Sequence, residues 1–337
     1  MESATFKSLL KQIQESDLLR FNTKQNHAPM VLIAMYRMGA NESQLRSYFS
    51  KLEIATDSTD AQKRLAINHQ SWKEYLGRFD ALGSYCHFFQ SEVGTLGTET
   101  ALRTYVPALL GGVTAHAFHP LLRLAYGIDV SDDTEIALAL AYWAATYLPG
   151  PQIPEDKPEI APGDLLKKVA SLPSLRAIKP DSRSIAARIH QFYSHSDFRD
   201  TLQPIRFDAK DPLKGISLAI SEAFVDNHHF TMLHGVTGCC ALRFVLPHIC
   251  DQRKAISEYW YSICAAYMSV ANLPGDKGRT LPESNLDWAS IQNQALATGV
   301  EHTIKLTYAC FREWEYYRRD SYRSLAIRDI GAPAPFY

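Results

Sequence analysis

Apolar residues recur along most of the chain at intervals of three and four positions, which is the period of an α-helix. The pattern predicts helices over residues 9–18, 30–38, 44–52, 72–82, 101–110, 121–126, 134–147, 216–224, 237–245, 255–271, 288–295 and 302–318. No stretch shows several alternating strands joined by hairpin turns. The sequence therefore predicts an all-α fold, as a single compact multi-helix domain over residues 1–337.

Two segments interrupt the helical pattern. Residues 149–163 hold five prolines among polar residues, and residues 272–285 combine proline, glycine and charged positions. Both compositions are typical of loops. The proline-rich loop at 149–163 either separates two lobes or crosses the surface of one domain, and the sequence leaves these alternatives open.

Composition is ordinary for a globular protein and argues against several classes of partner. Of the 337 residues, 46% are hydrophobic and 21% are charged, and the formal net charge is −1. This balance does not favour nucleic acid or an anionic membrane. The apolar run at residues 136–148 is too short to span a bilayer, and the N-terminus lacks the pattern of a signal peptide. Six cysteines without a Cys-x-x-Cys pair fit free thiols, so we expect a cytoplasmic protein.

Four of the twelve histidines lie at or near the start of apolar helical segments. These are His27, His119, His234 and His302. Pro120, directly after His119, suits the first turn of a helix, and the helix dipole there favours the neutral imidazole that binds metal ions. A hydrogen-bonded core histidine is the alternative at each position. A central histidine-rich metal site is thus a hypothesis that helix position alone does not decide.

Several familiar catalytic motifs are absent from the sequence. It contains no Gly-x-Gly-x-x-Gly, no Walker loop, no Gly-x-Ser-x-Gly elbow, no His-Glu-x-x-His and no pair of Glu-x-x-His motifs. Any metal would therefore be held mainly by nitrogen. The adjacent His228 and His229 would point in different directions on a helix, so we interpret this pair as structural or as supporting the ligands.

Five short strings, spread in order over nearly the whole chain, resemble the questin oxidase-like family. They are NHAPM (26–30), AFHPLLRLAY (117–126), ALALAYW (137–143), LHGVTG (233–238) and EHTIK (301–305). Each string alone is weak, and the five together are fairly specific. The resemblance implies an oxidoreductase, a non-haem iron oxygenase similar to fungal enzymes that open anthraquinone-type rings by Baeyer–Villiger-like or dioxygenase chemistry.

The resemblance also implies the metal ligands, because at least one family member resembles an iron enzyme with four histidines and a carboxylated lysine. Carried over by motif, the ligands are His27, His119, His234, His302 and Lys305. Burial beside a dication lowers a lysine pKa far enough for the neutral amine to add CO2. A solvated surface lysine is the alternative for Lys305. His116 is a reserve ligand, and Glu301 stands where the family often has Asp.

Further residues are candidates for catalysis and substrate binding. Arg123 and Tyr126 follow His119 and are the catalytic candidates, since an arginine can bind a phenolate. The candidates for the substrate pocket are His116, Phe118, Trp143 and Phe230. Core packing is the alternative for the aromatic residues, and a salt bridge is the alternative for the arginine.

Together these observations lead us to expect Fe2+, O2 and a small aromatic or quinone-like substrate. Zn2+ or another divalent ion is the alternative metal. A need for NADPH is open, because no nicotinamide-binding motif is visible. Two other functions stay open: a helical protein that binds an apolar ligand without chemistry, and a Zn-dependent hydrolase.

Overall fold

The computed structural model describes residues 3–19, 27–54, 65–152, 156–179, 184–271, 281–282 and 285–334. The α-helices are α1 (Ala4–Leu19), α2 (His27–Arg37), α3 (Glu42–Phe49), α4 (Leu82–Leu96), α5 (Thr98–Leu109), α6 (His119–Asp129), α7 (Asp133–Thr146), α8 (Pro162–Ser171), α9 (Pro173–Arg176), α10 (Ile185–Tyr193), α11 (Ser196–Thr201), α12 (Lys214–Asp226), α13 (Phe230–Val245), α14 (Gln252–Met268), α15 (Trp288–Thr298), α16 (Glu301–Tyr317) and α17 (Ser321–Gly331). Short 3-10 turns are η1 (Trp72–Tyr75), η2 (Phe79–Ala81), η3 (Leu110–Gly112), η4 (Ala115–Phe118) and η5 (Leu246–His248).

The all-α prediction is confirmed for the described residues, where no strand occurs. Ile160 and Ile205 form an isolated bridge. Some predicted elements are wrong. Residues 72–82 are not one helix but the turns η1 and η2, and α4 begins only at Leu82. The helix expected to start at residue 237 starts at Phe230, and α4, α8 to α11 and α17 were not predicted. Most of the predicted loop at 272–285 lies outside the described residues.

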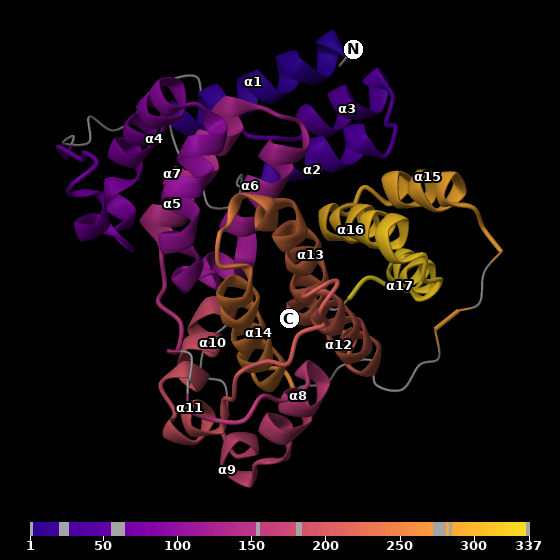
Figure 1. Ribbon diagram of the computed structural model, residues 1–337. Helices are drawn as coiled ribbons and strands as arrows, with labels where there is room; N and C mark the ends of the chain where they lie inside the picture. The colour runs from indigo at the N-terminus through magenta and orange to yellow at the C-terminus, as the bar shows by residue number, and fades with distance from the viewer. Residues whose placement is uncertain are drawn as a thin grey trace.

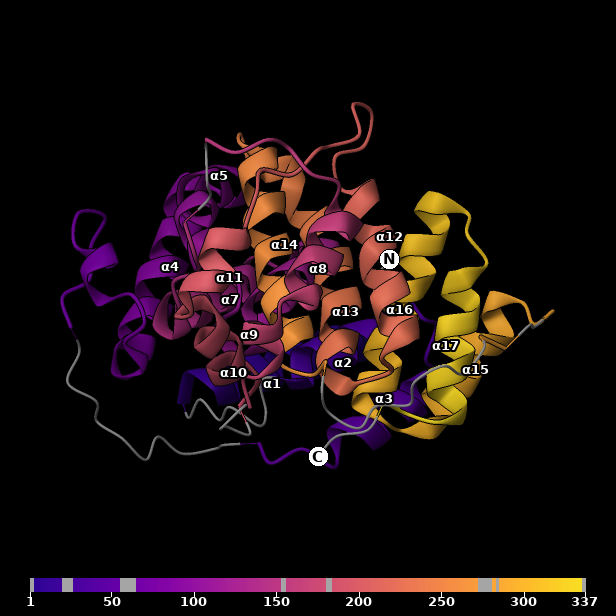
Figure 2. The same ribbon diagram turned by 90° about the horizontal axis from the view of Figure 1, so that it is seen from below.

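The helices pack around a central group formed by α6, α13 and α14 (Figure 1). On one side α7 packs against α4 and α6, and on the other α16 packs against α13, α15 and α17. Figure 2 shows these two groups on opposite sides of α13 and α14. The buried apolar side chains form one continuous cluster, although a single domain over the whole chain stays a prediction.

Four helices run side by side in the same direction: α2, α6, α13 and α16. At their far ends Arg37 of α2 donates to Asp129 at the end of α6, with Nε and Oδ2 2.7 Å apart. Arg312 of α16 also binds Asp129, at 3.3 Å, and its guanidinium lies 4.9 Å from the ring centre of Phe244 of α13. The first two turns of the same helices also meet, because they carry the neighbouring rings of His27, His119, His234 and His302. Because both ends coincide, all four N-termini point to one place.

One stretch among the described helices, Phe230–His248, is long and apolar enough to cross a membrane by length and composition. It consists of α13 and η5, and 83% of its most apolar window is buried inside the protein, which is the position of a core helix. The apolar run at residues 136–148, expected to be too short to span a bilayer, is largely α7, whose residues are buried from Glu135 to Ala145.

Candidate metal centre

The first two turns of α2, α6, α13 and α16 bring four imidazole rings together. We call His27, His119, His234 and His302 the histidine cluster. The ring centres of His27 lie 4.6 Å from His119 and 4.7 Å from His302, and His234 lies 5.0 Å from His119 and 5.2 Å from His302. Ligand atoms of His27, His119 and His302 lie within 4.8 Å of one another, as in a metal site.

Three rings of the histidine cluster are held through Nδ1. His27 Nδ1 donates to Glu301 Oε2 at 2.9 Å, and His234 Nδ1 donates to the Phe230 carbonyl at 2.9 Å. His119 Nδ1 donates to the His116 carbonyl at 2.5 Å. A carbonyl or carboxylate oxygen only accepts, so Nδ1 carries the proton in each ring. The lone pair of each Nε2 is therefore free to bind a cation.

The spacing of the Nε2 atoms fits a shared metal ion. His119 Nε2 lies 2.9 Å from His27 Nε2 and 3.3 Å from His234 Nε2. Two nitrogens that each lie about 2.1 Å from one metal are about 3.0 Å apart at a right angle and about 3.4 Å apart at a tetrahedral angle. Without a cation, these unprotonated nitrogens would only repel one another. The donor set therefore fits a nitrogen-bound metal.

A strained turn places His119 in the histidine cluster. His116, Ala117 and Phe118 have φ angles of +41°, +57° and +67°, the left-handed region that costs a non-glycine residue on the order of 1–3 kcal/mol. This turn aims the His116 carbonyl at His119 Nδ1. Pro120 then occupies the first turn of α6, where its missing N–H costs nothing. The local strain is thus tied to the orientation of one ring.

Burial keeps the histidine cluster neutral. It lowers the pKa of His27, His119 and His302 below the ordinary value and lowers that of His234 to about 3. The nearby charge of Lys305 lowers all four further. The positive ends of four helix dipoles act in the same direction. Neutral imidazole is the form that binds metals.

Lys305 lies one turn beyond His302 on α16 and is only 1% exposed. Its Nζ has no hydrogen-bond partner among the described residues, and neither has Nε2 of His302. Burial lowers the pKa of Lys305 to about 7, although the charge of Glu301 opposes this shift. These two unpaired buried atoms and the three free Nε2 atoms together form a donor set that fits a bound metal ion.

Glu301 and Tyr48 form a chain of hydrogen bonds that ends at Nδ1 of His27. The Tyr48 hydroxyl donates to Glu301 Oε1 at 3.1 Å while Oε2 accepts from His27. Burial alone would raise the pKa of Glu301, but the hydrogen bonds from His27 and Tyr48 and the charge of Lys305 favour the carboxylate, so the pKa is lowered. Nothing in the sequence pointed to Tyr48. Glu301 was indicated only by its place in the string EHTIK, where the family often has Asp.

The buried carboxylate of Asp329 holds the start of α16. Asp329 accepts a hydrogen bond from Thr303 Oγ1 at 2.7 Å and from His228 Nε2 at 3.2 Å. His229 caps α13, since its Nδ1 accepts from the Thr231 amide at 3.0 Å. The structure thus gives His228 and His229 the supporting places expected for this pair.

The candidates for the substrate pocket lie in different surroundings. Phe230 packs on the histidine cluster, with its ring centre 4.6 Å from His234 and 4.4 Å from His302. The His116 ring turns to the Tyr142 hydroxyl, at 2.7 Å, so only its carbonyl serves the cluster. Phe118 and Trp143 are both fully buried in the core.

The two catalytic candidates also differ. The Arg123 guanidinium is fully buried and donates to Glu135 at 2.6 Å and to Asp17 at 2.7 Å. These bonds join α6 to α7 and α1, so Arg123 has a structural role and no part in the proposed reaction. Tyr126 lies beside Tyr308, with ring centres 5.5 Å apart, and lines a crevice between α6, α13 and α16. The use of any of these residues as ligand or catalyst stays a prediction.

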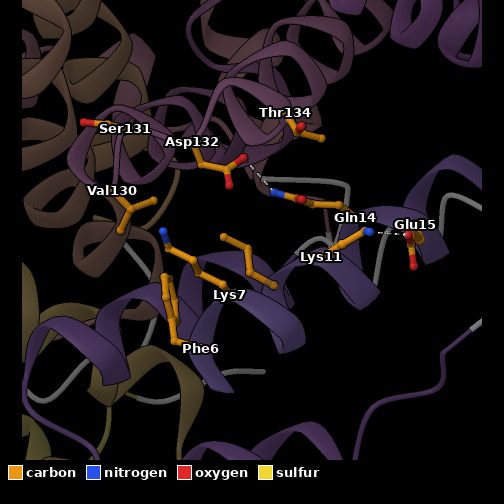
Figure 3. Close-up of a pocket in the computed structure, with 10 residues that line it drawn as sticks. Phe6, Lys7, Lys11, Gln14, Glu15, Val130, Ser131, Asp132 and Thr134 are labelled. Carbon is orange, nitrogen blue, oxygen red and sulfur yellow. Dashed lines mark hydrogen bonds and ion pairs between the residues drawn. The ribbon is translucent and has the colours of Figure 1, made fainter. Parts of the chain in front are cut away.

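A surface pocket of about 410 Å³ lies between α1 and the turn from α6 to α7 (Figure 3). Lys7 and Lys11 line it from α1, and Asp132, which accepts from Gln14 Nε2 at 3.0 Å, lines it from the opposite side. No member of the histidine cluster contributes to its wall. This pocket therefore does not belong to the candidate metal centre.

A comparison with known protein families covers the residues of the candidate metal centre. A family model described as Questin oxidase-like matches residues 24–310, which include the histidine cluster and Lys305. The protein named oxidoreductase AflY, from Aspergillus parasiticus, is 24% identical over 127 residues, or 34% of this chain and 26% of the relative. The chain thus spans about a quarter of the length of this curated relative.

Proposed function

The chain belongs to the questin oxidase-like family, and from this premise we propose that it is a non-haem iron oxygenase of an aromatic or quinone-like ring. The observation that carries the proposal is the set of Nε2 lone pairs in the histidine cluster, 2.9 Å and 3.3 Å apart at its closest pairs. The printed name of the relative, an oxidoreductase, supports the same class of reaction.

In this proposal the chain supplies the ligands and keeps them oriented. His27, His119, His234 and His302 would hold the metal through Nε2. Glu301 and the carbonyls of His116 and Phe230 keep the Nδ1 protons of His27, His119 and His234 in place, which fixes the tautomers of these three rings. These three rings would then not need to rotate to bind a metal.

Lys305 supplies the anionic ligand. Its neutral amine adds CO2, one N–C bond forms, one proton leaves to solvent, and the product is a carbamate with oxygen donors. The depressed pKa of about 7 makes the neutral amine available at physiological pH. The carbamate also balances the positive charge that a dication adds beside four helix N-termini.

Bound iron would supply the redox chemistry that allows O2 to react with an organic molecule, while the substrate supplies electrons. The same helix N-termini favour the substrate as an anion, a phenolate or enolate, over its neutral form. Phe230 offers an aromatic face against the cluster for a flat ring. Monooxygenation and dioxygenation both fit this arrangement.

An oxygen electrode tests the proposal directly. We expect protein reconstituted with Fe2+ to consume O2 with at least one member of a panel of hydroxylated anthraquinones. We expect His234→Ala to abolish the consumption and His87→Ala, at an exposed histidine of α4, to leave it unchanged. Hydrolysis of an ester panel by Zn-loaded protein without O2 uptake would overturn the proposal. Retention of an apolar ligand by metal-free protein that never binds iron would do so as well.

A further inference from the structure

The buried carboxylate of Asp329 in α17 joins three separate parts of the chain. Its Oδ2 accepts a hydrogen bond from Thr303 Oγ1 at 2.7 Å, and its Oδ1 accepts from His228 Nε2 at 3.2 Å and from the Ala334 amide at 2.9 Å. Asp329 is 0% exposed, so water does not compete for these bonds. A buried carboxylate costs free energy unless its oxygens are paired, and here both are. The three donors are therefore held to one point.

Two of these donors stand beside ligands of the candidate metal centre. Thr303 directly follows His302 in the first turn of α16. On the other side, His228 lies in the connection between α12 and α13, two residues before Phe230. The Phe230 carbonyl in turn accepts the Nδ1 proton of His234. One carboxylate thus links the starts of the two helices that carry these ligands.

The start of α16 has no side-chain cap. Its N-cap residue is Val300, whose side chain makes no hydrogen bond, whereas α13 is capped by His229. Acceptors at Nδ1 hold the other three rings of the histidine cluster, and none is found for His302 among the described residues. A carboxylate beside the first turn of a helix is also favoured by the helix dipole. The bond between Asp329 and Thr303 therefore acts where other supports are lacking.

We propose that Asp329 is a positioning residue of the candidate metal centre, which fixes His302 relative to His234 by holding the starts of α16 and α13 together. The centres of these two rings lie 5.2 Å apart. The inference rests on the metal site of the proposed function, but not on the reaction with O2. Residues that orient metal ligands change metal affinity about 10- to 100-fold without binding the metal themselves. Loss of the Asp329 bonds should therefore change the bound metal and not only the stability of the fold.

Titration of the metal-free protein with Co2+, followed by visible absorbance, tests the inference. Thr303→Val replaces a hydroxyl by a methyl group, so it breaks the bond to Asp329 and keeps the volume of the side chain. Thr307→Val is the matched control, because Thr307 is a buried threonine of the same helix whose Oγ1 has no hydrogen-bond partner among the described residues. We expect Thr303→Val to bind Co2+ about tenfold more weakly and with shifted absorption bands, and Thr307→Val to match the wild type. Equal results for the two variants overturn the inference.

Substitutions of Asp329 itself separate positioning from folding. In Asp329→Asn the amide oxygen can accept from His228 and Ala334, and the amide nitrogen can donate to Thr303 Oγ1. Asp329→Ala removes all three contacts. We expect Asp329→Asn to keep the Co2+ absorption bands of the wild type and Asp329→Ala to change them. Urea unfolding of the metal-free variants measures the cost in stability separately. An Asp329→Ala variant that is less stable but has unchanged bands contradicts the inference, and so do equally altered bands in both variants.

The inference and the proposed function fail in different ways. A wild type that binds Co2+ but consumes no O2 when loaded with Fe2+ contradicts the proposed reaction and does not affect the role of Asp329. A wild type that binds neither ion contradicts the metal centre, and the role of Asp329 fails with it. If Asp329→Ala does not fold, the comparison of Thr303→Val with Thr307→Val decides.

Discussion

Glu301 and the carbonyls of His116 and Phe230 each accept the Nδ1 proton of one ring in the histidine cluster. At the scale of single residues, these acceptors decide which nitrogen can bind a metal. Lys305 differs from the histidines, because nothing among the described residues pairs with its Nζ. The chemistry of the site therefore depends on residues that bind no metal and on one buried lysine.

Glu301→Gln is expected to weaken metal binding about 10- to 100-fold, because the amide no longer offers His27 a charged acceptor. Titration of the metal-free protein with Co2+, followed by absorbance, measures the change. Glu315→Gln, on the exposed side of the same helix, is the matched control and should bind as the wild type does. Equal affinities of the two variants would contradict the role of Glu301.

Lys305 should make the stability of the metal-free protein depend on pH. Between about pH 7, its pKa in the fold, and 10.5, its ordinary pKa, the unfolded chain holds a proton that the folded chain lacks. The free energy of unfolding therefore rises with pH across this window, by at most about 1.4 kcal/mol per pH unit. Urea unfolding in CO2-free buffer should show this rise in the wild type and its loss in Lys305→Met. The same slope in both proteins would argue against a buried amine.

At the scale of helices, hydrophobic spacing predicted the body of α2, α5, α7, α12, α14, α15 and α16, because each buries an apolar stripe or is apolar all round. It missed α4, α8 to α11 and α17. Of these, α9 and α11 are only four and six residues long, and α8 and α9 each begin at a proline. The aromatic residues within 72–82 recur at helical spacing, although the backbone there forms two 3-10 turns, so the pattern wrongly predicted one helix. Gly235 and Gly238 obscured the first two turns of α13, so His234 was expected before this helix, not inside it.

The ion pairs of Arg123 are a second feature at this scale that the sequence did not predict. The sequence shows that Arg123 stands one turn after His119, but nothing in it indicates that Asp17 and Glu135 bind the guanidinium in the core. Burial raises the pKa of Asp17 to about 6, although Arg123 opposes this shift. Asp17 therefore depends on the guanidinium to stay charged at neutral pH.

Arg123→Leu is expected to lower the free energy of unfolding by about 3–5 kcal/mol, because it leaves two buried carboxylates without a counter-charge. Arg103→Leu removes an exposed pair with Glu99 and should cost less than about 1 kcal/mol. Urea unfolding of both variants at pH 7 measures the difference. Similar costs for the two substitutions would show that the buried pairs do not hold α1, α6 and α7 together.

At the scale of the whole molecule, residues between His27 and Lys305 meet because four helices start at one point. The order of the motifs in the sequence indicated which residues belong to the site, but it could not show that the residues converge. Nor could the order of the motifs show the electrostatic cost of the arrangement. This cost arises because the positive ends of four helix dipoles surround the site proposed for a dication. In our proposal, Glu301 and a carbamate on Lys305 would supply negative charge there, and this would explain why a lysine stands among the proposed ligands.

The metal content of the purified protein tests the central claim most directly. Elemental analysis of protein expressed without added metal should find close to one iron ion per chain, since four imidazoles and an oxygen donor suit iron. His234→Ala should lose this iron, and His87→Ala should keep it. Wild-type protein that holds no stoichiometric metal even after anaerobic addition of Fe2+, or a His234→Ala variant that holds as much iron as the wild type, would contradict the account.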